Sequence, residues 1–166
     1  LLKNEGSLIF LGVGKSGQIG EKLAATFSSL GLPSFFLHPT EALHGDLGRV
    51  KKDDYFVLIS KSGSTEELFK LLPFLSNDSS RFIGLIGKTN SILAKRCGLV
   101  FDCGVEREAC LNNQAPTTST TVTLSIGDAM AVVFEKVAGL AKEGFAINHP
   151  GGLLGKSLLM KVSDIM

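Results

Sequence analysis

A cluster of hydroxyl side chains around one glycine is the feature of this sequence that most directly indicates chemistry. The segment "LISKSGSTEEL" carries Ser60, Ser62, Ser64 and Thr65 around Gly63, between an apolar run and an amphipathic one. Capping a helix requires one such hydroxyl, not several in succession. Hydroxyls and free backbone N–H groups that converge at a helix start can surround a phosphate ester. We therefore predict a phosphate-binding turn here, with helix capping as the simpler alternative.

A second glycine-rich turn, "IFLGVGKSGQIG", offers Gly14, Lys15 and Ser16 to an anion. Its Gly-Lys-Ser matches the end of a nucleotide P-loop, but the first glycine of that motif would fall at position 9, which is isoleucine. A dinucleotide site needs an acidic residue at the end of the second strand, and here the first carboxylate, Glu41, comes late. We expect a general anion site at a helix N-terminus, the alternative being glycines that only permit close packing.

Candidate groups for proton transfer lie in the predicted loops. Glu108, in "VEREACLNNQAPTT", follows the last apolar run, and apolar surroundings would raise its pKa toward the range useful for a general base. Glu67 is the rival carboxylate, although a partner for the helix dipole is its simpler role. His38, His44 and His149 each lie beside Pro or Gly, in loops of the kind that carry ligand sites; a structural or merely exposed role is the alternative for each.

The elements that must position these groups follow from the hydrophobic pattern. Apolar runs of strand length, "SLIFLGV", "SFFL", "YFVLIS", "RFIGLIG" and "LVFDC", are continuous rather than alternating, and helical segments separate most of them. This pattern is typical of strands covered on both faces. It predicts an α/β fold with a doubly wound, five-stranded parallel sheet and helices on both faces. The first helix should run from about Ser16 to Leu30, with Gly31 just past its end.

The longest predicted helix is "TSTTVTLSIGDAMAVVFEKVAGL", and one apolar stripe runs along it. The stripe consists of Val122, Ile126, Ala129, Met130, Val133 and Val137. Its other faces are largely Thr, Ser, Ala and Gly. We expect this helix to be buried on most sides, by the sheet and by another subunit.

Composition excludes several classes of function. The chain has 166 residues, 44% of them hydrophobic, enough for one domain with a sizeable core. Its net charge of +1 gives no basic stripe for nucleic acid, and no apolar run is long enough to cross a membrane. Three cysteines without a C-x-x-C pair favour a reducing cytoplasm, and no charged-then-apolar leader opens the chain. A chain that begins at Leu1 is expected to be part of a longer protein.

Five segments together resemble one family. "GVGKSG", "HPTEALHGDLG", "SKSGSTEE", "EREACLNNQAPTTSTT" and "FAINHPGGLLGKSLL" are similar, in order and spacing, to the sugar isomerase (SIS) domain of the D-arabinose 5-phosphate isomerases, which supply the Kdo sugar of Gram-negative lipopolysaccharide. The resemblance implies a flavodoxin-like SIS fold over residues 1–160. It also implies that residues 161–166, which include "VSDIM", begin a CBS-like region.

The resemblance implies an activity and a set of residues. The activity is the interconversion of D-ribulose 5-phosphate and D-arabinose 5-phosphate through a cis-enediolate, which needs no metal or redox cofactor. The protein is expected to be a homo-oligomer, a tetramer, in which His149 reaches a neighbouring subunit's site. The positions that match the family's catalytic residues are Lys15, Glu67, Glu108 and His149. Those that match its substrate-contacting histidines are His38 and His44. An inhibitory zinc is also implied at His38, although no second ligand accompanies it at a fixed spacing.

Two departures from the family pattern concern the expected site. Lys61 stands where the family has Asn, which adds a positive charge near the anion, and "CLNNQAPTT" replaces the more usual "CPLGLAPTT", which affects the pocket wall and hence substrate preference. We expect Glu108 to carry the proton and His149 to assist ring opening or relay a proton, and these two roles could be exchanged. The alternative function is a non-catalytic SIS sensor, which needs the hydroxyl-rich turn but no base.

Overall fold

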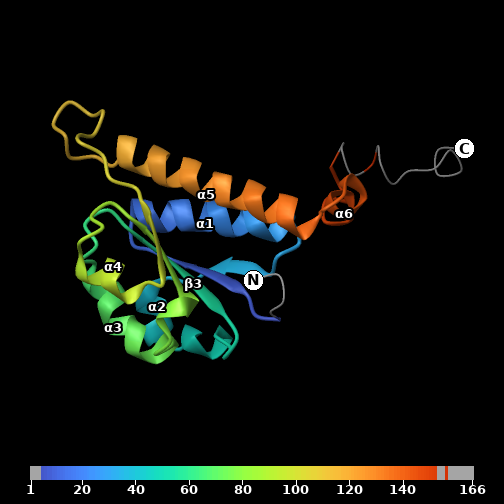
Figure 1. Cartoon of the computed structure of the whole chain (residues 1–166), viewed down its shortest axis with the longest axis horizontal. Coiled ribbons are helices and arrows are strands. Elements are labelled where there is room, and N and C mark those ends of the chain that lie inside the picture. The colour runs from blue at the N-terminus through green and yellow to red at the C-terminus, as the bar shows by residue number, and fades with distance from the viewer. Residues whose placement is uncertain (1–4, 153–155, 157–166) are drawn as a thin grey trace, which may run out of the picture.

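One parallel sheet organises the chain. The computed structural model describes residues 5–152 and 156 (Figure 1). Neighbouring strands pair in the order β2-β1-β3-β4-β5, all parallel. The strands are β1 (Leu8–Leu11), β2 (Ser34–Phe36), β3 (Tyr55–Ser60), β4 (Phe82–Ile86) and β5 (Leu99–Asp102). All five predicted strands are confirmed, and so is the parallel arrangement.

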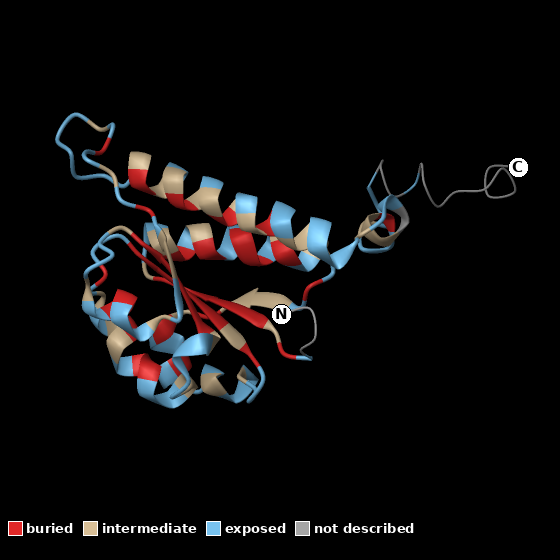
Figure 2. Cartoon of the chain, in the orientation of Figure 1, coloured by how far each residue is buried: buried red, intermediate tan, exposed pale blue. Residues whose placement is uncertain are grey.

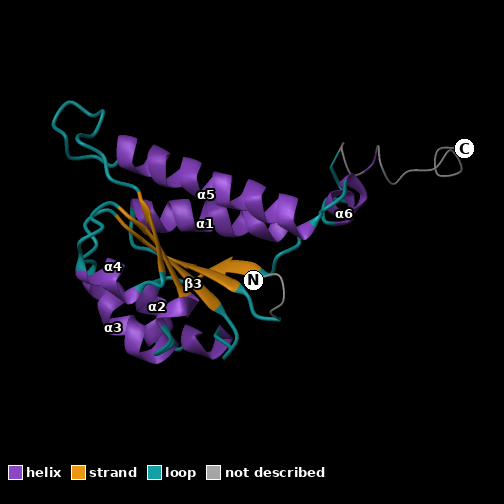
Figure 3. Cartoon of the chain, viewed as in Figure 1, coloured by secondary structure: helices purple, strands orange, loops and turns teal. Residues whose placement is uncertain are grey.

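Helices cover both faces of this sheet, as Figures 1 and 3 show. One layer holds the two long helices, α1 (Lys15–Ser29) and α5 (Thr118–Ala138), and α6 (Lys142–Ile147) follows α5. The opposite layer holds α2 (Pro39–Leu43), α3 (Glu66–Leu75) and α4 (Ile92–Arg96). Two short 3₁₀ turns, η1 (Asp46–Arg49) and η2 (Ser79–Arg81), complete the elements. The predicted doubly wound α/β fold is therefore confirmed.

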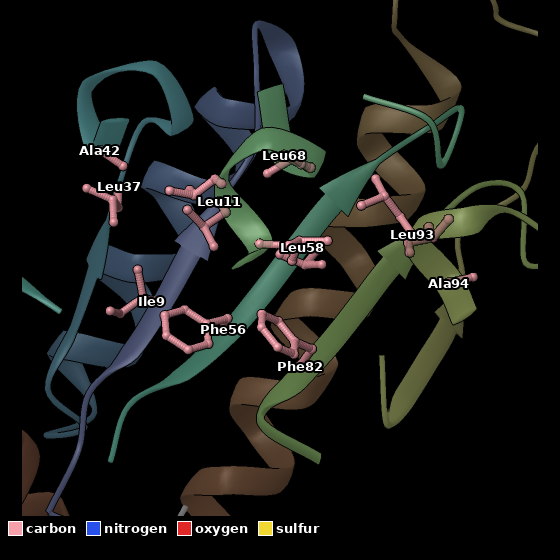
Figure 4. Close-up of a cluster of buried hydrophobic side chains, with 13 residues drawn as sticks. Ile9, Leu11, Leu37, Ala42, Phe56, Leu58, Leu68, Phe82, Leu93 and Ala94 are labelled. Atoms are coloured by element: carbon pink, nitrogen blue, oxygen red, sulfur yellow. The ribbon is translucent and has the colours of Figure 1, made fainter. Parts of the chain in front are cut away.

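The continuous apolar runs result from burial of the strands on both sides. Successive side chains of a strand point to opposite faces. Leu8 and Phe10 of β1 belong to the core beneath α1 and α5, whereas Ile9 and Leu11 belong to the core beneath the short helices. Figure 4 shows the second of these clusters, and Figure 2 shows the central strands buried along their length. A strand with only one covered face would instead show alternating apolar and polar residues.

The turn before α1 shows why its glycines differ. A side chain at Gly12 would place its Cβ 2.9 Å from the backbone carbon of Ser16, so this glycine is needed for close packing. Gly14 has φ +59° and open space around it, and its carbonyl accepts a hydrogen bond from the Gln18 N–H. The close-packing alternative therefore holds for Gly12, while Gly14 is selected by its backbone conformation. At the other end, Gly31 follows the helix at φ +84°, as predicted.

The expectation for α5 needs correction. Its buried face consists of small residues, Ser119, Thr123, Gly127 and Ala131, and packs against α1. A Cβ at Gly127 would lie 2.4 Å from a methyl group of Leu23, so only a small side chain permits this approach. The predicted apolar stripe lies beside this face. Its distal members Val133 and Val137 are 61% and 62% exposed in the single chain.

Two expectations concern the chain ends and the membrane. The predicted domain boundary after residue 160 and the CBS-like segment at 161–166 lie outside the described residues. Within the described part, every helix is too short or too polar to span a membrane.

Candidate active site

Residues that directly follow four strands line two adjoining pockets at the carboxyl edge of the sheet. The wide pocket, of about 420 Å³, is lined by Ser16, Lys61, Ser62, Thr65, Gly87, Lys88 and Val105. The narrow pocket, of about 100 Å³, is lined by residues that include Lys15, Ser16, Lys61, Cys103, Ser119 and Thr120. Ser16 and Lys61 line both pockets, so the two spaces meet at these side chains. The carboxyl edge is where parallel α/β sheets bind ligands.

The hydroxyl residues of the predicted turn have different roles. Ser60 is buried, and its Oγ accepts a hydrogen bond from the Gly63 N–H at 3.0 Å and bonds the Thr65 hydroxyl at 2.8 Å. Ser60 therefore shapes the turn from inside. Ser62 and Thr65 line the wide pocket, while Ser64 is exposed and bonds the Ser62 hydroxyl through its own N–H and hydroxyl.

Lys88 is a candidate anion ligand that the sequence motifs did not single out. It lies in the turn after β4 and lines the wide pocket with Gly87. A signal was available, because a lysine directly after a predicted parallel strand lies at the same edge as the hydroxyl-rich turn. With Lys61 it gives the wide pocket two positive charges beside the hydroxyls of Ser62 and Thr65, a combination suited to a phosphate group.

Glu108 lies in the long connection between β5 and α5 and has no exposed surface. Its Oε2 accepts the backbone N–H groups of Thr117 and Ser119 at 2.8 and 3.1 Å, where α5 begins. Its Oε1 accepts from the Ser119 hydroxyl and from the Lys61 ammonium, whose Nζ lies 2.6 Å away. The connection itself is fixed by the Asn113 side chain, whose Oδ1 accepts the Glu108 N–H at 2.6 Å. The carboxylate is thus held in one orientation.

The electrostatic prediction for Glu108 was wrong. We expected apolar surroundings to raise its pKa. Instead, the Lys61 ammonium and then the Ser119 hydroxyl hold the pKa of this carboxyl well below its usual range, and the N–H of Thr117 contributes in the same direction. Together these hydrogen bonds outweigh burial, which by itself would raise the pKa. The position of Lys61 is the reason: it pairs with Glu108 at the junction of the pockets instead of only adding charge to the anion turn. Glu108 is therefore an ionised acceptor at neutral pH.

Lys15 lies at the start of α1, as the sequence predicted, and lines the narrow pocket. This pocket is also lined by two residues that were not predicted, Thr120 and Cys103. Lys15 is exposed, with Ser16 beside it. Burial raises the pKa of the Cys103 thiol. Thr120 lies in the first turn of α5, in a run of hydroxyl residues that could have been recognised as a second helix start.

The remaining predicted residues are not brought together with these pockets. Glu67 lies half-buried in the first turn of α3. His38 caps α2, with its Nδ1 accepting the Thr40 N–H at 3.3 Å, and His44 is exposed at the end of the same helix. Among the described residues, neither pocket lining includes these three side chains. The zinc implied at His38 stays a prediction, and no group of three or more His, Cys, Asp or Glu side chains within the described part could hold a metal ion.

His149 lies at the opposite end of the helical layer from the pockets of its own chain. The neighbouring Asn148 donates a hydrogen bond to the carbonyl of Ser29 at the end of α1, while Ser16 at its start lines the pockets. A helix rises about 1.5 Å per residue, which separates Ser16 from Ser29 by roughly 20 Å. His149 stacks on Phe145, with 4.0 Å between the ring centroids. A catalytic role for His149 therefore requires the site of another chain.

Comparison with known proteins identifies the fold family. The SIS domain family matches residues 1–133. The chain belongs to the SIS domain family. This SIS domain is 48% identical over 166 residues to the arabinose 5-phosphate isomerase KdsD of Pseudomonas aeruginosa, covering 100% of this chain and 51% of that protein. It is 46% identical over 166 residues to the arabinose 5-phosphate isomerase KpsF of Escherichia coli, covering 100% and 52%.

A solved structure shows the same arrangement. The E. coli CFT073 protein c3406, in complex with arabinose 5-phosphate, is 44% identical to this SIS domain with a TM-score of 0.84, covering 90% of this chain and 80% of that one. This SIS domain spans about half the length of the curated relatives it matches.

Proposed function

We propose that this SIS domain is the catalytic part of an aldose–ketose isomerase that interconverts D-ribulose 5-phosphate and D-arabinose 5-phosphate. The single observation that carries the proposal is the junction at Lys61, where an anion pocket with hydroxyls and two lysines meets the pocket beside a buried, ionised glutamate. The names of relatives 46–48% identical over the whole chain support it. The product would serve synthesis of the Kdo sugar of lipopolysaccharide, as the sequence resemblance implies.

In this proposal the wide pocket holds the phosphate and the narrow pocket receives the carbonyl end of the sugar. Ser62, Thr65 and Lys88 bind the phosphate oxygens, and the turn built by Ser60 and Gly63 keeps them in place. Anchoring the phosphate aligns the reacting carbons with the protein groups, so that binding energy far from the reaction lowers its barrier.

Proton transfer between C1 and C2 is assigned to Glu108. As base it takes the proton from the carbon next to the carbonyl, and the carboxylic acid so formed gives a proton, the same one or one exchanged with solvent, to the other carbon of the enediolate. A second proton leaves the hydroxyl oxygen that becomes the carbonyl and joins the former carbonyl oxygen, so that no electron acceptor is required. Lys15, on the narrow pocket, stabilises the negative oxygen of the enediolate. His149 of a second copy assists ring opening or relays a proton, and Glu67 is retained as the rival base.

The exposed part of α5 supports self-association. Phe101, Ile126, Ala129, Met130 and Val133 line a hollow of about 410 Å³ beside the exposed valines of the helix. A second copy is the partner that also explains why His149 lies so far from its own pockets. Light scattering should give the mass of an oligomer, with four chains expected. The substitution Val133→Asp should reduce that mass.

The isomerase proposal is tested with the purified chain and D-ribulose 5-phosphate in D₂O, followed by ¹H NMR. We expect aldose signals to appear and deuterium to enter C1 of the remaining ketose. The rival function, a sensor, gives a different result: the phosphosugar raises the melting temperature, but neither aldose nor deuterium exchange appears. We also propose, from the sequence resemblance alone, that a CBS-like region begins at residues 161–166.

A further inference from the structure

The Lys61 side chain lies between the Glu108 carboxylate and the two pockets that it lines. Glu108 is completely buried, whereas the Lys61 side chain is half exposed, lines both pockets and places its Nζ 2.6 Å from Oε1. In this arrangement a ligand in the narrow pocket meets the Lys61 and Ser119 side chains and not the carboxylate behind them. A group assigned to proton transfer must be reached by its substrate. The cover therefore has to open.

The two oxygens of Glu108 are held by partners of different mobility. Oε2 is fixed by the N–H groups of Thr117 and Ser119, which belong to the backbone at the start of α5, and it also accepts from the Thr117 hydroxyl at 3.2 Å. Oε1 is held by side chains, the Ser119 hydroxyl and the Lys61 ammonium. The lysine has a flexible four-carbon stem and can exchange one acceptor for another. When Lys61 leaves, the carboxylate keeps its orientation, and Oε1 keeps the Ser119 hydroxyl but gains one free acceptor position.

A phosphate in the wide pocket is the acceptor that would draw Lys61 away. It carries nearly two negative charges and three acceptor oxygens, against the single charge of the carboxylate. Ser62 and Lys88 lie on the same pocket and would fix it within reach of Lys61. We propose that Lys61 is a positioning residue that covers Glu108 in the free protein and turns to the phosphate of a bound phosphosugar, so that phosphate binding uncovers the carboxylate. The inference rests on the proposed function, because it takes Glu108 as the proton carrier.

Other charged groups near the junction have different positions. Lys15 and the Cys103 thiol line the narrow pocket, and Lys88 lines the wide one. Glu106 and Arg107, which precede Glu108 in the chain, are exposed. Among the described residues, Lys61 is the charged side chain that bonds Glu108. Lys88 therefore serves as the matched control, a lysine of the same pocket without this contact.

The direct test follows the Glu108 carboxyl carbon by ¹³C NMR at pH 7 while inorganic phosphate is added. The signal is assigned by its loss in Glu108→Gln. We expect it to shift saturably in the wild-type protein and to stay still in Lys61→Asn. In Lys88→Gln it should shift as in the wild type, but at about 10-fold more phosphate, as expected after loss of a hydrogen bond to a charged group. Lys61 is half exposed, so Lys61→Asn leaves the core unchanged.

The amide signals of residues 62–65 separate the possible failures. If phosphate moves these amides saturably while the Glu108 carbon stays still, the inference about Lys61 is overturned and the phosphate site stands. If the amides do not respond to phosphate, the proposed phosphate site fails, and the inference fails with it.

Steady-state kinetics supply a second test. If Lys61 bonds the phosphate during turnover, Lys61→Asn should raise KM for the phosphosugar about 10-fold or more while kcat stays within about 3-fold, because the shorter, neutral side chain no longer bonds the bound phosphate. A fall in kcat of more than 10-fold at unchanged KM would mean that Lys61 stays on Glu108 throughout the reaction, which overturns the proposal.

Discussion

The substitution Gly63→Ala tests whether the shape of the phosphate turn depends on a glycine for two separate reasons. Gly63 has φ +64°, a conformation that costs an L-residue about 1–2 kcal/mol. An alanine would also place its Cβ 2.0 Å from Oγ and 2.4 Å from Cβ of Ser91, which caps α4. Forcing a methyl group into a packed site costs a further ~1–3 kcal/mol. The sum is about 2–5 kcal/mol of unfolding free energy, much of the stability of a domain.

Gly139 provides the matched control for this prediction. It has φ +65° at the end of α5, and an added Cβ would meet nothing within 4 Å. Gly139→Ala should therefore lose only the backbone part, about 1–2 kcal/mol. Urea unfolding of the two variants measures the difference, which is the packing cost at Ser91. Ser91→Gly removes both clashing atoms, so in the Gly63→Ala background it should recover part of the loss.

Equal losses in Gly63→Ala and Gly139→Ala would refute this reasoning, because the packing contribution would then be absent. So would a double variant, Gly63→Ala with Ser91→Gly, whose loss is the simple sum of the single losses. If the reasoning holds, the displaced turn also weakens phosphosugar binding. KM for the phosphosugar should then rise in Gly63→Ala and stay unchanged in Gly139→Ala, which lies far from the pockets.

Three further predictions concern the site. Glu108→Gln should lower turnover about 100-fold in the isomerase assay while phosphosugar affinity stays within a few-fold, and unchanged turnover would assign the base to another group. Ser62→Ala should weaken phosphosugar binding by about 1–3 kcal/mol in calorimetric titration, and a defect confined to turnover would contradict its role at the phosphate. The pKa of Glu108 is lower in the folded than in the unfolded chain, so the ionised carboxylate stabilises the folded protein above the unfolded pKa of 4.5. This stabilisation is lost as the pH falls. Between about pH 5 and pH 3 the melting temperature should therefore fall more steeply in the wild type than in Glu108→Gln.

Much of the fold could be predicted because local patterns carry it. Continuous apolar runs indicated strands covered on both sides, and alternate residues such as Phe10 and Ile9 indeed enter opposite cores. The two glycine-containing turns were found because hydroxyls, glycines and a helix start leave a pattern in consecutive residues. α5 was predicted as a helix for the same reason. Its buried face was not, since the partner, Leu23 of α1, lies more than 100 residues away.

The sequence by itself determined the parallel sheet and the two glycine-containing turns, for which it predicts anion binding, and it placed Glu108 after the last strand. These depend on neighbouring residues and on the direction of parallel strands. Only the tertiary structure decided which groups meet: Lys61 and Glu108 are 47 positions apart and form an ion pair. That pair reverses the expected pKa shift, because an ammonium within hydrogen-bonding distance outweighs burial. Contacts between loops that follow different strands leave no trace in the local sequence of either, and the chemistry of this site depends on them.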